Sequence, residues 1–413
     1  MWRRVNNVVI FRLPLSSLWS GRRRRRLCRA CCLPVGRTTT RDNQSDPGIP
    51  CTRAPIPFTP RMSSTAIASA TSPVLRWLKR LGLAIVSLGL LLTGVWAVLA
   101  LHYQLPVAEP WRWVAGGLWA LAALTSAVWM WRGRAMPALL AYCMAFALLL
   151  GWWVRIEPSD TRAWADDVAR HLQWRQSGSV LTLINVRNFD WRSDTDYTAR
   201  WETRRYDLNR LQSVDTAMSY WMGPAISHTL VSFGFDDGQG GTEQLAFSIE
   251  IRKERSEQFS AVAGFFKQFE LSLVAADERD IFRVRTNVRG EDVFLYRVNM
   301  PPAARRALLL AYLAEADALA QAPRFYDTLF ANCTTIVYGM AQRIVGGLPL
   351  DWRLLASGYL PEYLQDVGAL APGHDLEALR AAGRITLRAQ AADADPRFSQ
   401  AIRRGVPGMA VQP

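Results

Sequence analysis

The residue best suited to chemistry in this sequence is Cys333, the single cysteine after Arg155. It follows Asn332, a preferred N-cap residue, and a helical pattern begins at Thr334. Cys333 would therefore lie in the first turn of a helix, where the helix dipole and free backbone N–H groups stabilise a thiolate and could hold an oxyanion. The sequence predicts a cysteine nucleophile here; the alternative is a small, buried apolar cysteine.

A cysteine nucleophile needs a base, and the chain after Arg155 offers three histidines. His171 falls in a predicted helix and His374 in a loop, whereas His228 falls in a predicted strand, in phase with Leu230. A titratable ring among apolar neighbours is unusual within a strand. The alternative is a core histidine that makes its hydrogen bonds within the fold and has no catalytic role. A strand histidine with a helix-start cysteine is typical of papain-like enzymes, here in circularly permuted order because the histidine comes first.

A third group should orient the imidazole. The predicted partner strand of His228 carries Ser248 and Glu250 on one face and apolar residues on the other. We predict that Glu250 orients His228, and Ser248 is the alternative. The sequence leaves the register of the two strands open.

Motifs for other chemistries are absent from the chain after Arg155. It contains no zinc-ligand spacing, P-loop, GxGxxG or GxSxG. The N-terminal cluster of Cys28, Cys31 and Cys32 lacks a second cysteine or histidine pair at zinc-finger spacing. We therefore expect neither a metal nor a cofactor.

The elements that must position these residues follow an α+β pattern, with strands first and helices after them. Residues 225–235 predict a strand, 236–241 a turn, and 244–251, which alternate strictly, the hairpin partner. Further strands are predicted at 180–186, 269–274 and 293–298, and helices at 301–320 and 334–345. This order of elements favours an antiparallel sheet.

Three uncharged runs, at 81–101, 114–131 and 135–154, are each long enough to cross a bilayer. Tryptophans lie at their ends, as interfacial aromatic residues do. The alternative is a set of buried core helices in a soluble protein.

Basic residues set the orientation of these spans. Arg76, Lys79 and Arg80 precede the first span, and Arg132 and Arg134 lie between the second and third. The positive-inside rule then places the N-terminus in the cytoplasm and the chain after the third span outside. In a bacterium this predicts a multi-pass inner (plasma) membrane protein with a periplasmic C-terminal domain.

The formal net charge of +14 comes from the N-terminal tail alone. Residues 1–80 hold 16 Lys and Arg against 2 Asp and Glu, and the rest of the chain holds 33 of each sign. Nucleic-acid binding could therefore lie only in the tail, and we expect none. We predict that the tail, 1–80, is disordered, and Met62 is an alternative start of translation.

The remaining boundaries follow composition. We expect a membrane-proximal helical linker at 155–179 and the main soluble domain at 180–370. Residues 371–413 are rich in Ala and Arg and predict a partly disordered C-terminal extension.

Three strings, SHTLVSFGF, QLAFSIEIRKE and FYDTLFANCTT, occur in an order that resembles the Lnb-type N-terminal periplasmic domain family. The resemblance covers about 180–370 and implies a permuted papain-like fold, related to NlpC-type amidases and lecithin:retinol acyltransferase. It implies thioester chemistry at Cys333 with His228 as base. It also implies that Asn332 orients the catalytic groups or stabilises the oxyanion. Glu250 falls in the SIE part of the pattern.

The resemblance also implies a substrate at the membrane. Cys333 would take an acyl chain from a lipid and pass it to an amine, such as the N-terminal cysteine of a lipoprotein. In the family's acyltransferase the membrane helices follow the domain, whereas here three predicted spans precede it, so the substrate stays open. Two alternatives remain: a peptidoglycan amidase or peptidase with the same Cys–His pair, and a non-catalytic, membrane-tethered binding module.

Overall fold

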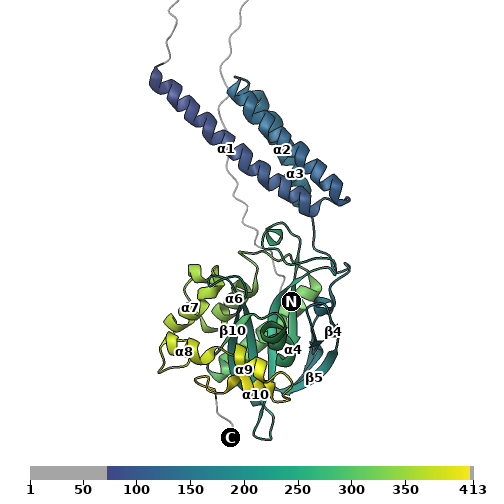
Figure 1. Ribbon diagram of the computed structural model, residues 1–413, viewed down its shortest axis with the longest axis vertical. Helices are drawn as coiled ribbons and strands as arrows, with labels where there is room; N and C mark the ends of the chain where they lie inside the picture. The colour runs from purple at the N-terminus through teal and green to yellow at the C-terminus, as the bar shows by residue number, and fades with distance from the viewer. Residues whose placement is uncertain (1–71, 410–413) are drawn as a thin grey trace, which may run out of the picture. The chain divides into compact units, whose positions relative to one another are not determined.

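Three long apolar helices open the structure, a computed structural model that describes residues 72–409 (Figure 1). They are α1 (Pro73–Gln104), α2 (Glu109–Trp131) and α3 (Ala135–Trp153). Each is long and apolar enough to cross a membrane, which agrees with the three predicted spans.

The predicted disordered tail does not extend to residue 80, because α1 begins at Pro73. The Ser72 hydroxyl accepts a hydrogen bond from the Leu75 N–H, and proline occupies the first turn, where its missing N–H costs nothing. The basic run, the cysteine cluster and the alternative start at Met62 lie outside the described residues.

Small residues let the three apolar helices approach closely. A Cβ added to Gly94 of α1 would lie 3.1 Å from the Cβ of Ala123 in α2. The hydroxyls of Thr93 in α1 and Tyr142 in α3 lie 3.0 Å apart. Close backbone approach and interhelical hydrogen bonds are the interactions that hold helices together within a bilayer.

The segment 155–179 is not the helix that its sequence predicted. It contains one short 3₁₀ turn (Asp166–Val168) and the strand β1 (Gln173–Ser177). Trp164 is buried and forms a β-bridge with Glu254, and the Ala165 N–H donates to the Lys253 carbonyl. The prediction was wrong because this pairing and burial override local helix propensity.

One sheet organises the rest of the described chain. Its order is β1-β2-β9-β8-β7-β6-β10, with β5 paired to β2. All neighbours are antiparallel except β2 and β9, which meet in parallel at Arg187 and Ala276. This confirms the α+β class. The strands are β2 (Val180–Arg187), β5 (Trp201–Asp207), β6 (Leu211–Tyr220), β7 (Ser227–Asp236), β8 (Thr242–Arg252), β9 (Glu270–Ala276) and β10 (Asp292–Arg297), with a separate pair β3 (Asp190–Trp191) and β4 (Tyr197–Thr198).

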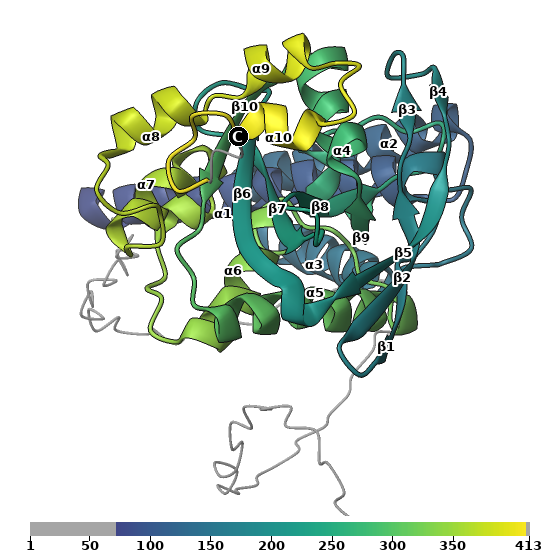
Figure 2. The same cartoon turned by 90° about the horizontal axis from the view of Figure 1, so that it is seen from below.

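Helices cover both faces of this sheet (Figure 2). On one face α5 (Pro302–Gln321) and α6 (Cys333–Val345) pack on a core that includes Phe233, Phe247 and Tyr312. On the other face α4 (Glu278–Arg283), α9 (Thr386–Ala391) and α10 (Phe398–Arg403) pack on a core that includes Leu230 and Ala246. A π-helical turn (Val284–Val288) continues α4, and α7 (Leu360–Asp366) and α8 (Leu376–Gly383) cover the edge at β10.

The predicted hairpin is confirmed as β7 and β8, and the helix predicted at 334–345 is α6. The predicted loose C-terminal extension is wrong for residues 371–409. Ile385, Phe398 and Ile402 are fully buried in the core under α9 and α10. The abundance of Ala and Arg hides the four-residue spacing of Phe398 and Ile402, which places both on one helix face.

Phe398→Ala should lower the free energy of unfolding by about 3–5 kcal/mol, because it leaves a cavity in a packed core. The measurement is the urea midpoint of pulse proteolysis on the full chain in detergent. Leu387→Ala is the control, since Leu387 lies nearby on α9 but is 72% exposed. Equal midpoints for the two variants would show that the C-terminal helices do not belong to the core.

Candidate active site

Cys333 is the first residue of α6, and a capping box fixes this position. The Asn332 side-chain oxygen accepts hydrogen bonds from the N–H groups of Thr334 and Thr335, and the Thr335 hydroxyl accepts one from the Asn332 N–H. Asn332 is therefore the N-cap that the sequence predicted. Cys333 is 8% exposed, so its thiol sits at a helix N-terminus in a buried setting.

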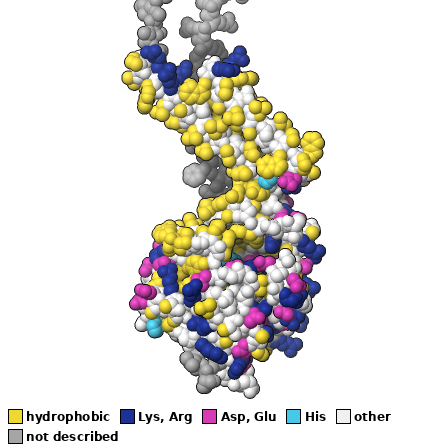
Figure 3. All heavy atoms as spheres, viewed as in Figure 1, with side chains coloured by type: hydrophobic (Ala, Val, Ile, Leu, Met, Phe, Trp, Pro, Cys, Tyr) yellow, Lys and Arg dark blue, Asp and Glu magenta, His cyan; other side chains and the backbone are white. Residues whose placement is uncertain are grey.

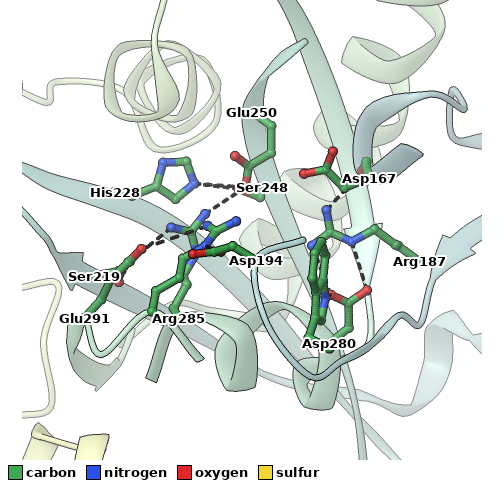
Figure 4. A network of polar contacts seen from close by, with 12 residues as sticks. Asp167, Arg187, Asp194, Ser219, His228, Ser248, Glu250, Asp280, Arg285 and Glu291 are labelled. Atoms are coloured by element: carbon green, nitrogen blue, oxygen red, sulfur yellow. Dashed lines mark hydrogen bonds and ion pairs between the residues drawn. The ribbon is translucent and has the colours of Figure 1, made fainter. Parts of the chain in front are cut away.

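His228 is the second residue of β7, nearer the strand start than its sequence predicted. Its Nε2 lies 2.7 Å from the Ser248 hydroxyl and 3.3 Å from a Glu250 carboxylate oxygen (Figure 4). The Ser248 hydroxyl donates to that same oxygen of Glu250, so it accepts from His228, and Nε2 carries a hydrogen. Nδ1 is then the ring nitrogen that can take the proton of a thiol.

The strand register explains this grouping. Ser219 of β6 pairs with His228, and Leu230 of β7 pairs with Ser248 of β8, so the side chains of these polar residues share one face of the sheet. The ladder between β7 and β8 ends at Leu230 and Ser248, which leaves His228 and Glu250 in the splayed part of the hairpin. The predicted pairing of His228 with Glu250 is therefore present, and Ser248 joins it.

His228 and Cys333 interact electrostatically. Burial alone would raise the pKa of the Cys333 thiol, but the charge and hydrogen bonding of His228 lower it below its ordinary value. Burial and Arg285 lower the pKa of His228, but Glu250 and Cys333 outweigh them and raise it to about 9. Both directions favour a thiolate–imidazolium pair near neutral pH.

Two threonines complete the setting of the thiol. The Thr229 and Thr334 hydroxyls lie 3.0 Å apart and join β7 to the start of α6. The backbone of Thr229 and the hydroxyl of Thr334 also lower the pKa of Cys333. Both threonines are therefore part of the site, and no sequence pattern marks Thr229 beyond its place after His228.

A chain of buried charges continues from Glu250 and was not predicted. Arg285 Nη2 lies 2.9 Å from Glu250 Oε1, and Arg285 Nη1 lies 3.2 Å from Glu291, which accepts a hydrogen bond from Ser219 (Figure 4). Burial would raise the pKa of Glu250, but His228 and Arg285 hold it well below its ordinary value. Glu250 is therefore an anion that favours the imidazolium form of His228. No sequence motif marks Arg285, which lies 35 residues from its partner in the chain.

In the described part of the chain, the imidazole of His228 has no hydrogen bond or ion pair with Asn332, His171 or His374. The Asn332 amide donates to the Thr328 carbonyl, and its oxygen caps α6. Its proposed orienting or oxyanion role stays a prediction. His171 lies 2.7 Å from Asp160, and His374 lies in a loop after α7.

The cap also bears on the predicted oxyanion hole. Because Asn332 occupies the N–H groups of Thr334 and Thr335, the N–H of Cys333 itself is the donor that the first helical turn leaves for an oxyanion.

Among residues 72–409, no cluster of three or more His, Cys, Asp or Glu could hold a metal ion.

The residues of this site lie within a segment that matches a known family. Residues 197–358 match the family model of the Lnb N-terminal periplasmic domain, which confirms the resemblance seen in the sequence. The match spans β4 to the segment before α7 and contains His228, Glu250 and Cys333. No curated protein and no solved structure matches the chain. The family and the three apolar helices together indicate a membrane-anchored protein with a periplasmic domain.

The reactivity of Cys333 should report its pairing with His228. Alkylation by iodoacetamide, followed by mass spectrometry of the Cys333 peptide, should give an apparent pKa below the ~8.5 of a free cysteine. In His228→Ala the apparent pKa should rise to that value or above it, because burial then acts unopposed. His171→Ala is the matched control and should leave the profile unchanged. A profile that is the same in wild type and His228→Ala would contradict the pairing.

Arg285→Leu should lower the free energy of unfolding by about 3–5 kcal/mol, because it removes the buried cation between the carboxylates of Glu250 and Glu291 and leaves Glu250 with His228 alone. Urea midpoints from pulse proteolysis of the full chain measure this loss. Arg192→Leu removes an exposed pair with Asp196 and should leave the midpoint unchanged. If both variants unfold at the same midpoint as wild type, Arg285 does not hold the carboxylates together.

Proposed function

We propose that the protein is a cysteine acyltransferase or hydrolase that acts through a thioester on Cys333 at the membrane surface. The observation that carries the proposal is the placement of Cys333 at the buried start of α6, in electrostatic contact with His228, whose Nε2 lies 2.7 Å from Ser248 and 3.3 Å from Glu250. Burial, a charge partner and a helix N-terminus together are the arrangement that activates cysteine nucleophiles.

The proposed reaction has two steps. The Cys333 thiolate attacks an acyl carbonyl, the N–H of Cys333 stabilises the oxyanion, and the imidazolium of His228 gives its Nδ1 proton to the departing alkoxide. An amine or water then attacks the thioester, His228 takes its proton, and the thiolate leaves with its electron pair. Glu250 keeps Nε2 protonated and the ring in place throughout.

A lipid donor and a lipoprotein amine form the specific version of this proposal. The membrane helices support it, because they hold the site close to lipids and to lipid-anchored proteins. A His-bearing strand followed by a Cys-bearing helix also supports a permuted papain-like arrangement.

The second candidate is a peptidoglycan amidase or peptidase, which the same Cys333–His228 pair would serve. A membrane-anchored periplasmic site faces the cell wall as well as the bilayer. The third candidate is a non-catalytic binding module. In such a module the domain would bind a partner without reacting with it, and Cys333 would serve only as a packed core residue.

The test is to incubate the full chain in liposomes whose phospholipids carry a labelled acyl chain. The Cys333 peptide should gain one hydroxylamine-sensitive acyl group, and His228→Ala should reduce this adduct by about 10²–10⁴-fold, the range for loss of a general base. Cys143→Ser is the control, since Cys143 lies in α3, and it should leave the adduct intact.

The amidase would instead be supported if the protein releases peptides from isolated cell wall and forms no acyl adduct in liposomes. If neither product forms and Cys333→Ala changes stability alone, the binding module is the correct description.

A further inference from the structure

Large apolar side chains are exposed in three segments that flank α6. Phe330, three residues before Cys333, is 77% exposed, and Leu350, after the end of α6, is 85% exposed. We call these residues and four others the apolar rim. The rim consists of Phe259, Val262, Phe265, Phe330, Leu350 and Trp352.

Two of the rim segments are joined directly, and the third packs back on α6. The Thr328 hydroxyl, just before Phe330, donates to the Ala261 carbonyl, which lies between Phe259 and Val262. After α6, the chain turns back so that the Tyr338 hydroxyl donates to the Leu348 carbonyl, next to Leu350. Figure 3 shows apolar side chains gathered on the upper part of the domain, whereas charged side chains dominate its lower part. Such a gathering exceeds the scattered exposure that is usual for soluble proteins.

The rim is continuous with the ends of the membrane helices. Phe266, next to Phe265, packs on Tyr103 of α1 at 5.7 Å and on Trp153 of α3 at 6.2 Å between ring centroids. The Gln104 amide donates to the Phe266 carbonyl at 2.8 Å, and Lys267 Nζ donates to the Trp153 carbonyl at 2.8 Å. Aromatic and lysine side chains at the ends of spans are typical of the bilayer interface. One end of the rim is therefore fixed where the chain leaves the membrane.

We propose that the apolar rim inserts into the leaflet on the domain side, so that lipid covers it. Three membrane-capable helices in the same chain, whose ends contact Phe266 next to Phe265, would bring lipid to the rim, whereas contact with a second copy would need a separate encounter. The inference rests on the proposed function where it concerns chemistry. With the rim in lipid, the donor for Cys333 is a bilayer lipid whose acyl ester stays in the leaflet.

The test uses the full chain in nanodiscs of phosphatidylcholine that carries a diazirine on its acyl chain. After illumination, mass spectrometry should find lipid adducts on the peptides with Phe259–Phe265, Phe330 and Leu350–Trp352, as well as on α1–α3. Leu387 is the matched control, because it is equally apolar and 72% exposed on α9, and its peptide should carry no adduct. Phe330→Ser with Leu350→Ser should reduce rim adducts several-fold and leave those on the spans unchanged.

Adducts confined to the spans would overturn the proposal. The readout does not depend on Cys333, so the two proposals fail separately. Rim adducts without an acyl group on Cys333 would refute the proposed function alone. An acyl group on Cys333 without rim adducts would refute the rim alone.

Discussion

The site depends on an alternation of buried charges that runs from Cys333 through His228, Glu250 and Arg285 to Glu291. Each of the three inner members, His228, Glu250 and Arg285, lies between groups of opposite sign, and this is the condition under which charges persist in a low-dielectric interior. The alternation explains why the pKa of Cys333 falls although burial alone would raise it. A change at any link acts on both of its neighbours, so the reactivity of the thiol and the stability of the domain share one network.

Elements from distant parts of the chain must meet to build this network, and the C-terminal helices hold one of them. Arg285 lies in the π-helical turn after α4, a local departure from regular helix that is frequent at functional sites. The side chain of Gln390 donates to the Thr286 carbonyl at 3.1 Å, and that of Asn287 donates to the Ala389 carbonyl at 3.1 Å. Helix α9 therefore holds the turn from which Arg285 reaches Glu250. The Ala- and Arg-rich C-terminal segment, whose composition suggested a loose extension, thus supports the site.

What the sequence could predict was local. Strict alternation marked the hairpin that carries His228 and Glu250, and the cap signal of Asn332 marked the start of α6 at Cys333. Arg285 escaped prediction because its role comes from a long-range contact that no spacing encodes. The helical linker and the loose extension were wrong for a related reason, since their structure depends on tertiary burial of residues such as Trp164 and Phe398 rather than on propensity.

The burial of Cys333 bears on whether the proposed thioester would be transferred or hydrolysed. A thiolate that is 8% exposed gives water little access, so an acyl group held there would survive until a nucleophile reaches it along the substrate's own path. If that path opens at the lipid leaflet, an amine anchored in the same leaflet arrives at high effective concentration, while water is dilute. Membrane anchoring and burial of the thiolate would then act together to favour transfer to an amine over hydrolysis.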